Sequence, residues 1–91
     1  MTLTGATTSI IGEQSTGANR GKIKFVTSGG DGDIAFETTT NGAGAITEAM
    51  RIDHNGNVGI GINSPSHTLH LSATEPYIKF QRTHTDGLYL I

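Results

Sequence analysis

The sequence predicts an all-β protein of short strands joined by glycine-rich turns, and three observations support this prediction. Apolar residues recur at every second position in several short runs, which is typical of strands with one buried face. Thirteen glycines among 91 residues cluster largely between these runs. Only residues 45–51 form a window that could hold a helix, because glycines and β-branched residues fill most of the remaining chain.

Residues 1–20 are predicted to form a loosely ordered lead-in, because they are mainly Thr, Gly, Ser and Ala around one apolar pair. That pair, Ile10 and Ile11, predicts one short strand near residues 8–11. Residues 21–91 are predicted to form the β-rich segment, in which the period-two pattern is much clearer.

Short alternating runs succeed one another through the β-rich segment. Polar, glycine-rich breaks at residues 28–33 and 41–44 separate the first of them and indicate turns. After the second break, Ile46, Met50 and Ile52 all occupy even-numbered positions. This parity predicts that the three side chains share one face of a strand.

The Asn-Gly pair at residues 55–56 predicts a β-hairpin with a three-residue loop. A two-residue loop would place the apolar residues of the two strands out of step, whereas a loop of residues 54–56 aligns them. We expect a type I turn with Gly56 in the left-handed conformation and Asp53 accepting a backbone N–H. The aligned pairs would be Ile52 with Val58 and Met50 with Ile60.

Gly59 and Gly61 alternate with apolar residues in the next run. Glycine weakens a strand by roughly 0.5–1 kcal/mol relative to Ala, so two alternate glycines require a structural reason. We expect either that another backbone approaches this face closely or that the strand bends. Several chains wound closely about a common axis would produce such an approach.

The composition excludes several classes of function. The chain is 34% hydrophobic and 15% charged, its net charge is −2, and it contains no cysteine. The lack of cysteine excludes disulfide scaffolds and thiolate metal sites. We expect no nucleic-acid or membrane partner, because the charge offers no attraction for phosphates or anionic lipids and no apolar run could span a bilayer.

The apolar content is low for a domain of this size, which normally buries about 60–65% of its unfolded surface. Small domains with a thin core gain stability from disulfides, metals or partner subunits. Disulfides are excluded and no clear ligand set for a metal is present. We therefore expect the chain to associate with copies of itself.

Residues 49–61 read Ala-Met-Arg-Ile-Asp-His-Asn-Gly-Asn-Val-Gly-Ile-Gly. This order resembles a signature of bacteriophage tail fibres and related virion appendages. The Ser-Pro turn at residues 63–66 and the short strand at residues 69–72 resemble the usual continuation of that family. Residues 75–80 resemble the start of a further shaft repeat, so the match covers roughly residues 45–81.

The resemblance implies a fibrous homotrimeric shaft of the triple β-helix or β-prism type, in which three chains share one core. Such shafts often precede a self-cleaving intramolecular chaperone domain. Two positions depart from the family pattern: His54 replaces a small polar residue at a turn tip, and Ile62 replaces a residue that is often Thr. The residues expected to face the shared axis are Ile23, Phe25, Ile34, Phe36, Met50, Ile52, Val58, Ile60, Ile62, Leu69, Leu71, Ile78 and Phe80.

No catalytic, cofactor-binding or metal-binding residue is predicted, and we expect neither enzymatic activity nor a cofactor. Ser, His and Asp are all present, but no nucleophile-elbow, paired-carboxylate or metalloprotease motif brings them together. His67 and His70 would point to opposite faces of one extended strand. One histidine from each of three chains could still form a metal site on a threefold axis, and this alternative stays open for His54, His67, His70 and His84.

The sequence therefore predicts a structural segment of a phage tail fibre, located in the virion and outside the cell. It would form a trimeric stalk that supports host-cell attachment. Its expected partners are further copies of the chain, other tail or tail-fibre proteins and, as an option, host-surface glycan. Two alternatives stay open: a glycan-binding module that acts through loops at residues 28–33 or 38–44, and a monomeric β-sandwich or barrel with an unrelated cellular role.

Overall fold

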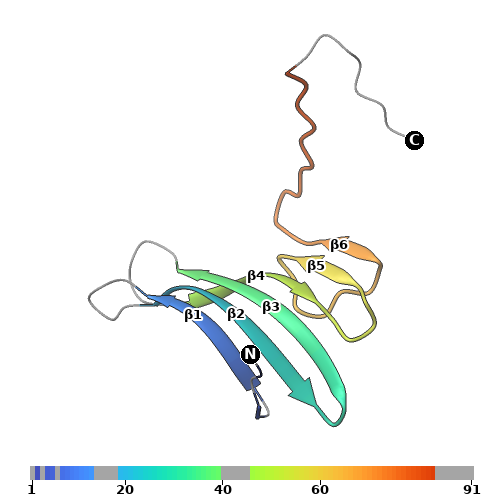
Figure 1. Ribbon diagram of the computed structural model, residues 1–91. Coiled ribbons are helices and arrows are strands. Elements are labelled where there is room, and N and C mark those ends of the chain that lie inside the picture. The colour runs from blue at the N-terminus through green and yellow to red at the C-terminus, as the bar shows by residue number, and fades with distance from the viewer. Residues whose placement is uncertain (1, 3, 6, 14–18, 40–45, 84–91) are drawn as a thin grey trace.

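The computed structural model describes residues 2, 4–5, 7–13, 19–39 and 46–83. Within these ranges the chain forms one open six-stranded sheet and no helix, which confirms the all-β prediction (Figure 1). The spatial order of the strands equals their order in the chain. The strands are β1 (Thr7–Glu13), β2 (Asn19–Ser28), β3 (Asp31–Thr39), β4 (Ile46–Ile52), β5 (Val58–Ile60) and β6 (Leu69–Leu71).

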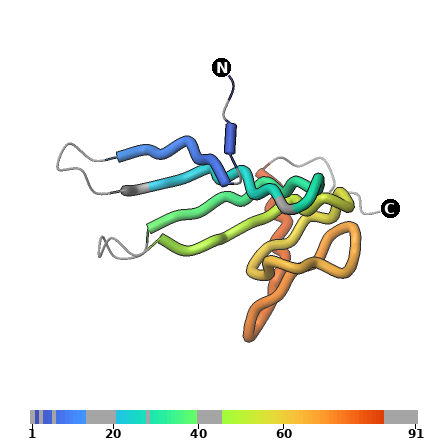
Figure 2. The backbone as a smooth tube through the Cα atoms, turned by 90° about the horizontal axis from the view of Figure 1, so that it is seen from below, coloured from blue at the N-terminus to red at the C-terminus, as the bar shows by residue number. Residues whose placement is uncertain are grey.

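Each strand pairs with the next one along the chain, so β1 to β4 lie side by side (Figure 2). The pairs from β1 to β5 are antiparallel, and only β5 and β6 are parallel. Antiparallel neighbours need only short turns, which suits a chain rich in glycine. Gly29 and Gly30, with φ angles of 65° and 135°, supply one such turn between β2 and β3.

The short strand expected near residues 8–11 is present and longer than expected, because β1 pairs with β2 at seven positions. Part of the lead-in therefore belongs to the sheet. The predicted break at residues 41–44, most of the loop at residues 38–44 and His84 lie outside the described residues.

The hairpin between β4 and β5 confirms the predicted three-residue loop. The N–H of Gly56 donates to the carbonyl oxygen of Asp53 at 2.9 Å, and Gly56 has a φ of 82°. Asp53 Oδ1 accepts the backbone N–H groups of Asn55 and Asn57 at 3.0 and 2.9 Å. As expected, Ile52 faces Val58 and Met50 faces Ile60.

A β-bulge at Ala49 overturns the prediction that Ile46 shares a face with Met50 and Ile52. Met50 pairs with Phe36, whereas the next pair along β3 joins Glu37 to Glu48, so Ala49 has no partner in β3. An extra residue of this kind shifts the alternation of side chains by one position. Ile46 consequently lies on the face opposite to Met50, although both positions are even-numbered.

The predicted close approach at Gly59 and Gly61 exists, but the approaching backbone belongs to the same chain. An added Cβ at Gly59 would lie 2.6 Å from the carbonyl oxygen of Ile62, and one at Gly61 would overlap the carbonyl oxygen of Ser72. Gly61 has a φ of 77°, which ends β5 and turns the chain over the sheet. Ile62 therefore packs against Gly59 and does not continue the face of Ile60, contrary to the prediction.

Residues 73–83 leave the sheet as an extended segment without strand pairing (Figure 1). Ile78 and Phe80 are exposed in it, at 64% and 57% of their surfaces. These two side chains were expected to join the apolar set, but they do not lie on the sheet. A single extended segment cannot pair its backbone groups internally, because strands need a neighbour.

The described residues form one layer of structure and bury little apolar surface. Ala35 is the buried hydrophobic residue among them, and none of their large side chains is fully buried. The chain exposes 6933 Å², whereas a compact monomer of 9.5 kDa exposes about 5,000 Å². Its radius of gyration is 16.5 Å, against about 12 Å for a compact domain of this length.

The open single sheet in the described ranges is neither a two-sheet sandwich nor a closed barrel, so the monomeric alternative finds no support there. A search of the described residues found no helix with the length and hydropathy of a membrane span.

We predict that Gly61→Ala destabilises the fold by about 2–4 kcal/mol, because the left-handed backbone and the overlap with Ser72 both oppose a Cβ. Gly32→Ala is the control, since its Cβ would have 4.0 Å of space and its φ is not positive. Urea unfolding at matched protein concentration measures the free energy of unfolding of both variants. Equal losses in the two variants would contradict this account of Gly61.

Candidate interaction surface

The register of the sheet collects apolar side chains into two rows that cross all six strands. Each row takes one residue from each strand, and no member of either row is charged. We call this surface the apolar face. The first row is Thr8, Phe25, Ile34, Ile52, Val58 and Leu69, and the second is Ile10, Ile23, Phe36, Met50, Ile60 and Leu71.

The apolar face contains every residue predicted for the shared core except Ile62, Ile78 and Phe80. Its side chains remain accessible: Ile10 is 42% exposed, Ile60 41% and Leu69 58%. Neither a second sheet nor a helix covers it within the described part of the chain. Contiguous exposed apolar surface of this kind marks an interaction site in a soluble protein.

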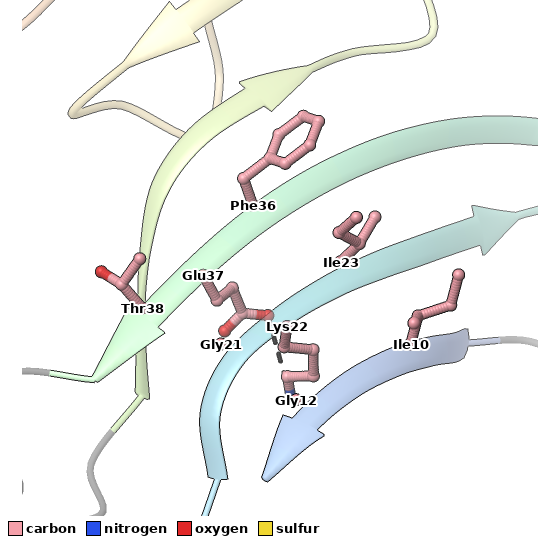
Figure 3. A pocket seen from close by; sticks show the side chains of 8 residues that line it. All are labelled: Ile10, Gly12, Gly21, Lys22, Ile23, Phe36, Glu37 and Thr38. Carbon is pink, nitrogen blue, oxygen red and sulfur yellow. Dashed lines mark ion pairs between the residues drawn. The ribbon is translucent and has the colours of Figure 1, made fainter.

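A shallow hollow of about 370 Å³ lies at one end of this region. Gly12 and Gly21 face each other in its floor, so two adjacent strands contribute no side chain there. Figure 3 shows Ile10, Ile23 and Phe36 projecting from three neighbouring strands beside these glycines. Lys22, Glu37 and Thr38 also line the hollow, so it lies where the apolar face meets polar and charged side chains of β2 and β3.

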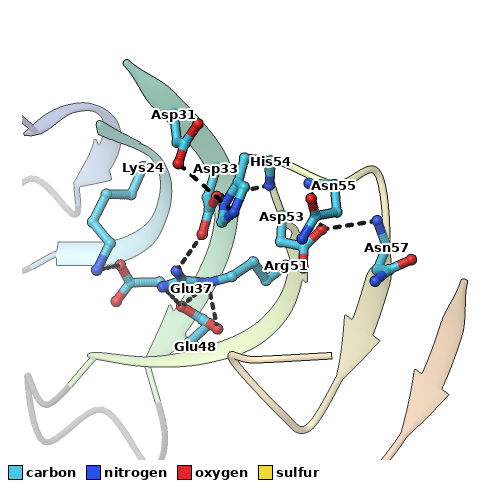
Figure 4. A network of polar contacts seen from close by, with 10 residues as sticks. All are labelled: Lys24, Asp31, Asp33, Glu37, Glu48, Arg51, Asp53, His54, Asn55 and Asn57. Atoms are coloured by element: carbon cyan, nitrogen blue, oxygen red, sulfur yellow. Dashed lines mark hydrogen bonds and ion pairs between the residues drawn. The ribbon is translucent and has the colours of Figure 1, made fainter. Parts of the chain in front are cut away.

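The opposite face of the sheet carries a chain of ion pairs (Figure 4). Arg51 lies at its centre: Nε donates to both carboxylate oxygens of Glu48 at 3.1 and 3.0 Å, and Nη1 donates to Asp33 Oδ2 at 2.8 Å. Glu48 and Arg51 are three positions apart and would lie on opposite faces of a regular strand. The bulge at Ala49 brings them to the same face.

Ala35 is buried between the charged side chains of neighbouring strands. Lys24 and Arg51 occupy the positions beside it on β2 and β4. Glu37 on the same strand is only 7% exposed, and its Oε1 lies 2.9 Å from Lys24 Nζ and 4.0 Å from Lys22 Nζ. The aliphatic stems of these cations cover the sheet while their charges pair with carboxylates.

Asp33 links the ion pairs to the turn between β4 and β5. Its Oδ1 accepts the backbone N–H of His54 at 2.9 Å and lies 3.1 Å from His54 Nδ1. Burial raises the pKa of Asp33, but the hydrogen bonds from His54 and Arg51 outweigh it and hold the pKa below its usual 3.8. Hydrogen bonding to Glu48 raises the pKa of Arg51, so this guanidinium stays charged.

The structure brings His67 and His70 together, contrary to the prediction that they point to opposite faces. Their ring centroids are 6.1 Å apart in an edge-on arrangement, because residues 62–68 form a loop and not an extended strand. Ser66 Oγ lies 3.0 Å from His67 Nδ1 and 3.4 Å from His70 Nδ1, and the N–H of Ser66 donates to His70 Nδ1 at 3.1 Å.

Among the described residues, Ser66, His67 and His70 contact one another, and no carboxylate contacts either imidazole. A catalytic imidazole is usually oriented by a third group, and all three residues here are joined to one another without a carboxylate in the described contacts. Among the described residues, no cluster of three or more His, Asp or Glu side chains could hold a metal ion.

The fold and its two surfaces define a structural class of protein, namely an open β-sheet with one uncharged apolar face and one face of paired charges. Comparison of the sequence with protein-family models and with curated proteins finds no match. The tail-fibre resemblance therefore stays a prediction, and the candidate surface rests on the geometry of the sheet.

We predict that Arg51→Met destabilises the protein by about 1–3 kcal/mol, because Glu48 and Asp33 lose their shared cation in a partly buried position. Lys79→Met is the matched control, since it removes the same charge from the exposed C-terminal segment. Thermal unfolding of both variants at neutral pH measures the difference in their stability. Similar stability of the two variants would show that the ion pairs around Arg51 contribute nothing measurable.

Proposed function

We propose that this chain is a structural segment of a bacteriophage tail fibre, in which three copies form a stalk that supports host-cell attachment. The observation that carries the proposal is the uncovered apolar face, which spans six strands without a charged side chain. In this proposal the face is buried between copies, and the charged face is turned toward water.

The exposed area supports association. The whole chain exposes 6933 Å², roughly 1,900 Å² more than a compact monomer of this mass, and the extended segment at residues 73–83 contributes to this excess together with the open sheet. Obligate interfaces bury about 2,000–5,000 Å² in total, or roughly half of that from each partner. An open single-layer sheet with exposed apolar side chains therefore has surface left to bury between copies.

The uncharged rows also favour a second copy of the chain over an unrelated charged partner. When two such faces meet, no charged group has to leave water, so burial of apolar surface is not offset by desolvation of ions. Burying a Val, Leu, Ile or Phe side chain contributes about 1.5–3 kcal/mol, and each row repeats in every copy.

The number of copies and the biological setting come from the sequence resemblance, which covers roughly residues 45–81. That resemblance supports a trimeric shaft in the virion, outside the cell, with other tail proteins at its ends. A stalk of this kind holds a receptor-binding part away from the particle. Contact of the stalk itself with host glycan belongs to the same proposal as an additional role.

We predict that the purified chain is trimeric at micromolar concentration and that its melting temperature rises with protein concentration, because assembly stabilises the folded state by mass action. Native mass spectrometry and light scattering measure the number of chains in the assembly. Thermal scans over a dilution series measure how the melting temperature depends on protein concentration. A stable monomer with a concentration-independent melting temperature would overturn the proposal.

Two neighbouring residues provide a matched pair of variants for locating the interface. Ile10 and Ile11 are 42% and 43% exposed on the same strand, but Ile10 belongs to the apolar face and Ile11 to the opposite face. Ile10→Asp should dissociate the assembly, whereas Ile11→Asp should leave it intact. The reverse outcome would place the interface on the charged face.

A further inference from the structure

We infer that His54 acts as a pH-dependent latch that fastens the turn between β4 and β5 to the turn between β2 and β3. The two turns lie at the same end of the sheet, since Ile34 pairs with Ile52 immediately before the segments diverge. His54 stands at the tip of one turn, and Asp31 and Asp33 follow the other. This inference is independent of how many chains assemble.

The contacts of His54 reach both carboxylates of the facing turn (Figure 4). Its Nδ1 lies 3.1 Å from Asp33 Oδ1, and its Nε2 lies 3.8 Å from Asp31 Oδ2. The backbone N–H of His54 donates to the same Asp33 oxygen at 2.9 Å. Nδ1 is within hydrogen-bond distance of Asp33, whereas the separation of Nε2 from Asp31 is that of an ion pair without a hydrogen bond, so the protonated ring can donate to one carboxylate and attract the other by charge.

The charged groups around His54 make its protonation favourable. Asp31 and Asp33 of β3 face the ring, and Asp53 precedes it in its own turn. Arg51 is the opposing cation, but its donors are directed to Glu48 and to the other oxygen of Asp33. His54 is therefore the residue that can add a positive charge to this acidic end of the sheet.

The direction of the pH effect follows from these contacts. The hydrogen bond to Asp33 raises the pKa of His54 above 6.5, with further help from the charges of Asp31, Asp33 and Asp53. A raised pKa in the folded state gives stability that is fully present below pH 6.5 and is lost as the pH rises through the folded value. Asp33 has a lowered pKa, so its contribution disappears only in acid, below about pH 3.8.

The test measures the titration of His54 and the stability that depends on it. NMR of the imidazole signals should place the His54 midpoint above 6.5, the ordinary value of the group. The wild-type chain should lose thermal stability as the pH rises above 6.5 and through the raised pKa of His54, and high salt should weaken this change. His54→Asn should lose less over the same interval.

Two further variants separate the latch from a general effect of pH. His54→Lys carries a charge across the whole interval and should remove the decline that wild type shows at the alkaline end. His67→Asn alters an exposed histidine of the neighbouring loop and should retain the full wild-type decline. An unshifted His54 midpoint, or a decline in His54→Asn as large as in wild type, would overturn the inference.

Discussion

The register between neighbouring strands is the constraint on which both faces of this sheet depend. Because side chains alternate from face to face, a slip of one residue would send a strand's apolar set to the charged side. The turn from Asp53 to Asn57 holds β4 and β5 in register through backbone and carboxylate hydrogen bonds. The Gly29-Gly30 turn does the same for β2 and β3. Two short turns therefore fix the register of two of the five strand pairings that build the apolar rows.

The separation of the faces could be predicted from sequence wherever the alternation is regular. The pairing of Ile52 with Val58 follows from apolar parity and the Asn-Gly turn alone. Two failures within the sheet occur where one residue interrupts the alternation. Ala49 bulges without a Gly or Pro to mark it, and Gly61 bends the chain where parity predicts a continuing strand. Both depend on long-range contacts, since the N–H of Gly61 donates to the carbonyl oxygen of Ala49 at 3.0 Å.

The bulge at Ala49 also explains why the ion-pair chain could not be predicted. Glu48 and Arg51 are three residues apart, a spacing that separates them in a regular strand and suggests no contact. Asp33 lies 18 positions from Arg51 and reaches it only through the β3–β4 register. The close approach of backbone at Gly59 and Gly61 was predicted correctly, but its sources are Ile62 in the loop after β5 and Ser72 directly after β6 of the same chain. The glycines thus reflect a local fold and carry no weight for close winding of several chains.

The charged face limits how copies of this chain can meet. Its cations and carboxylates already neutralise one another, so covering it would desolvate paired charges without providing new partners. The apolar face has no such penalty, and its burial is the main free-energy gain open to a single-layer sheet. In the proposed assembly, association would therefore be directional: the paired charges would keep one side hydrated, and the rows on the other side would supply the driving force. The latch at His54 lies on the hydrated side, so it can respond to solvent pH even when the apolar face is buried.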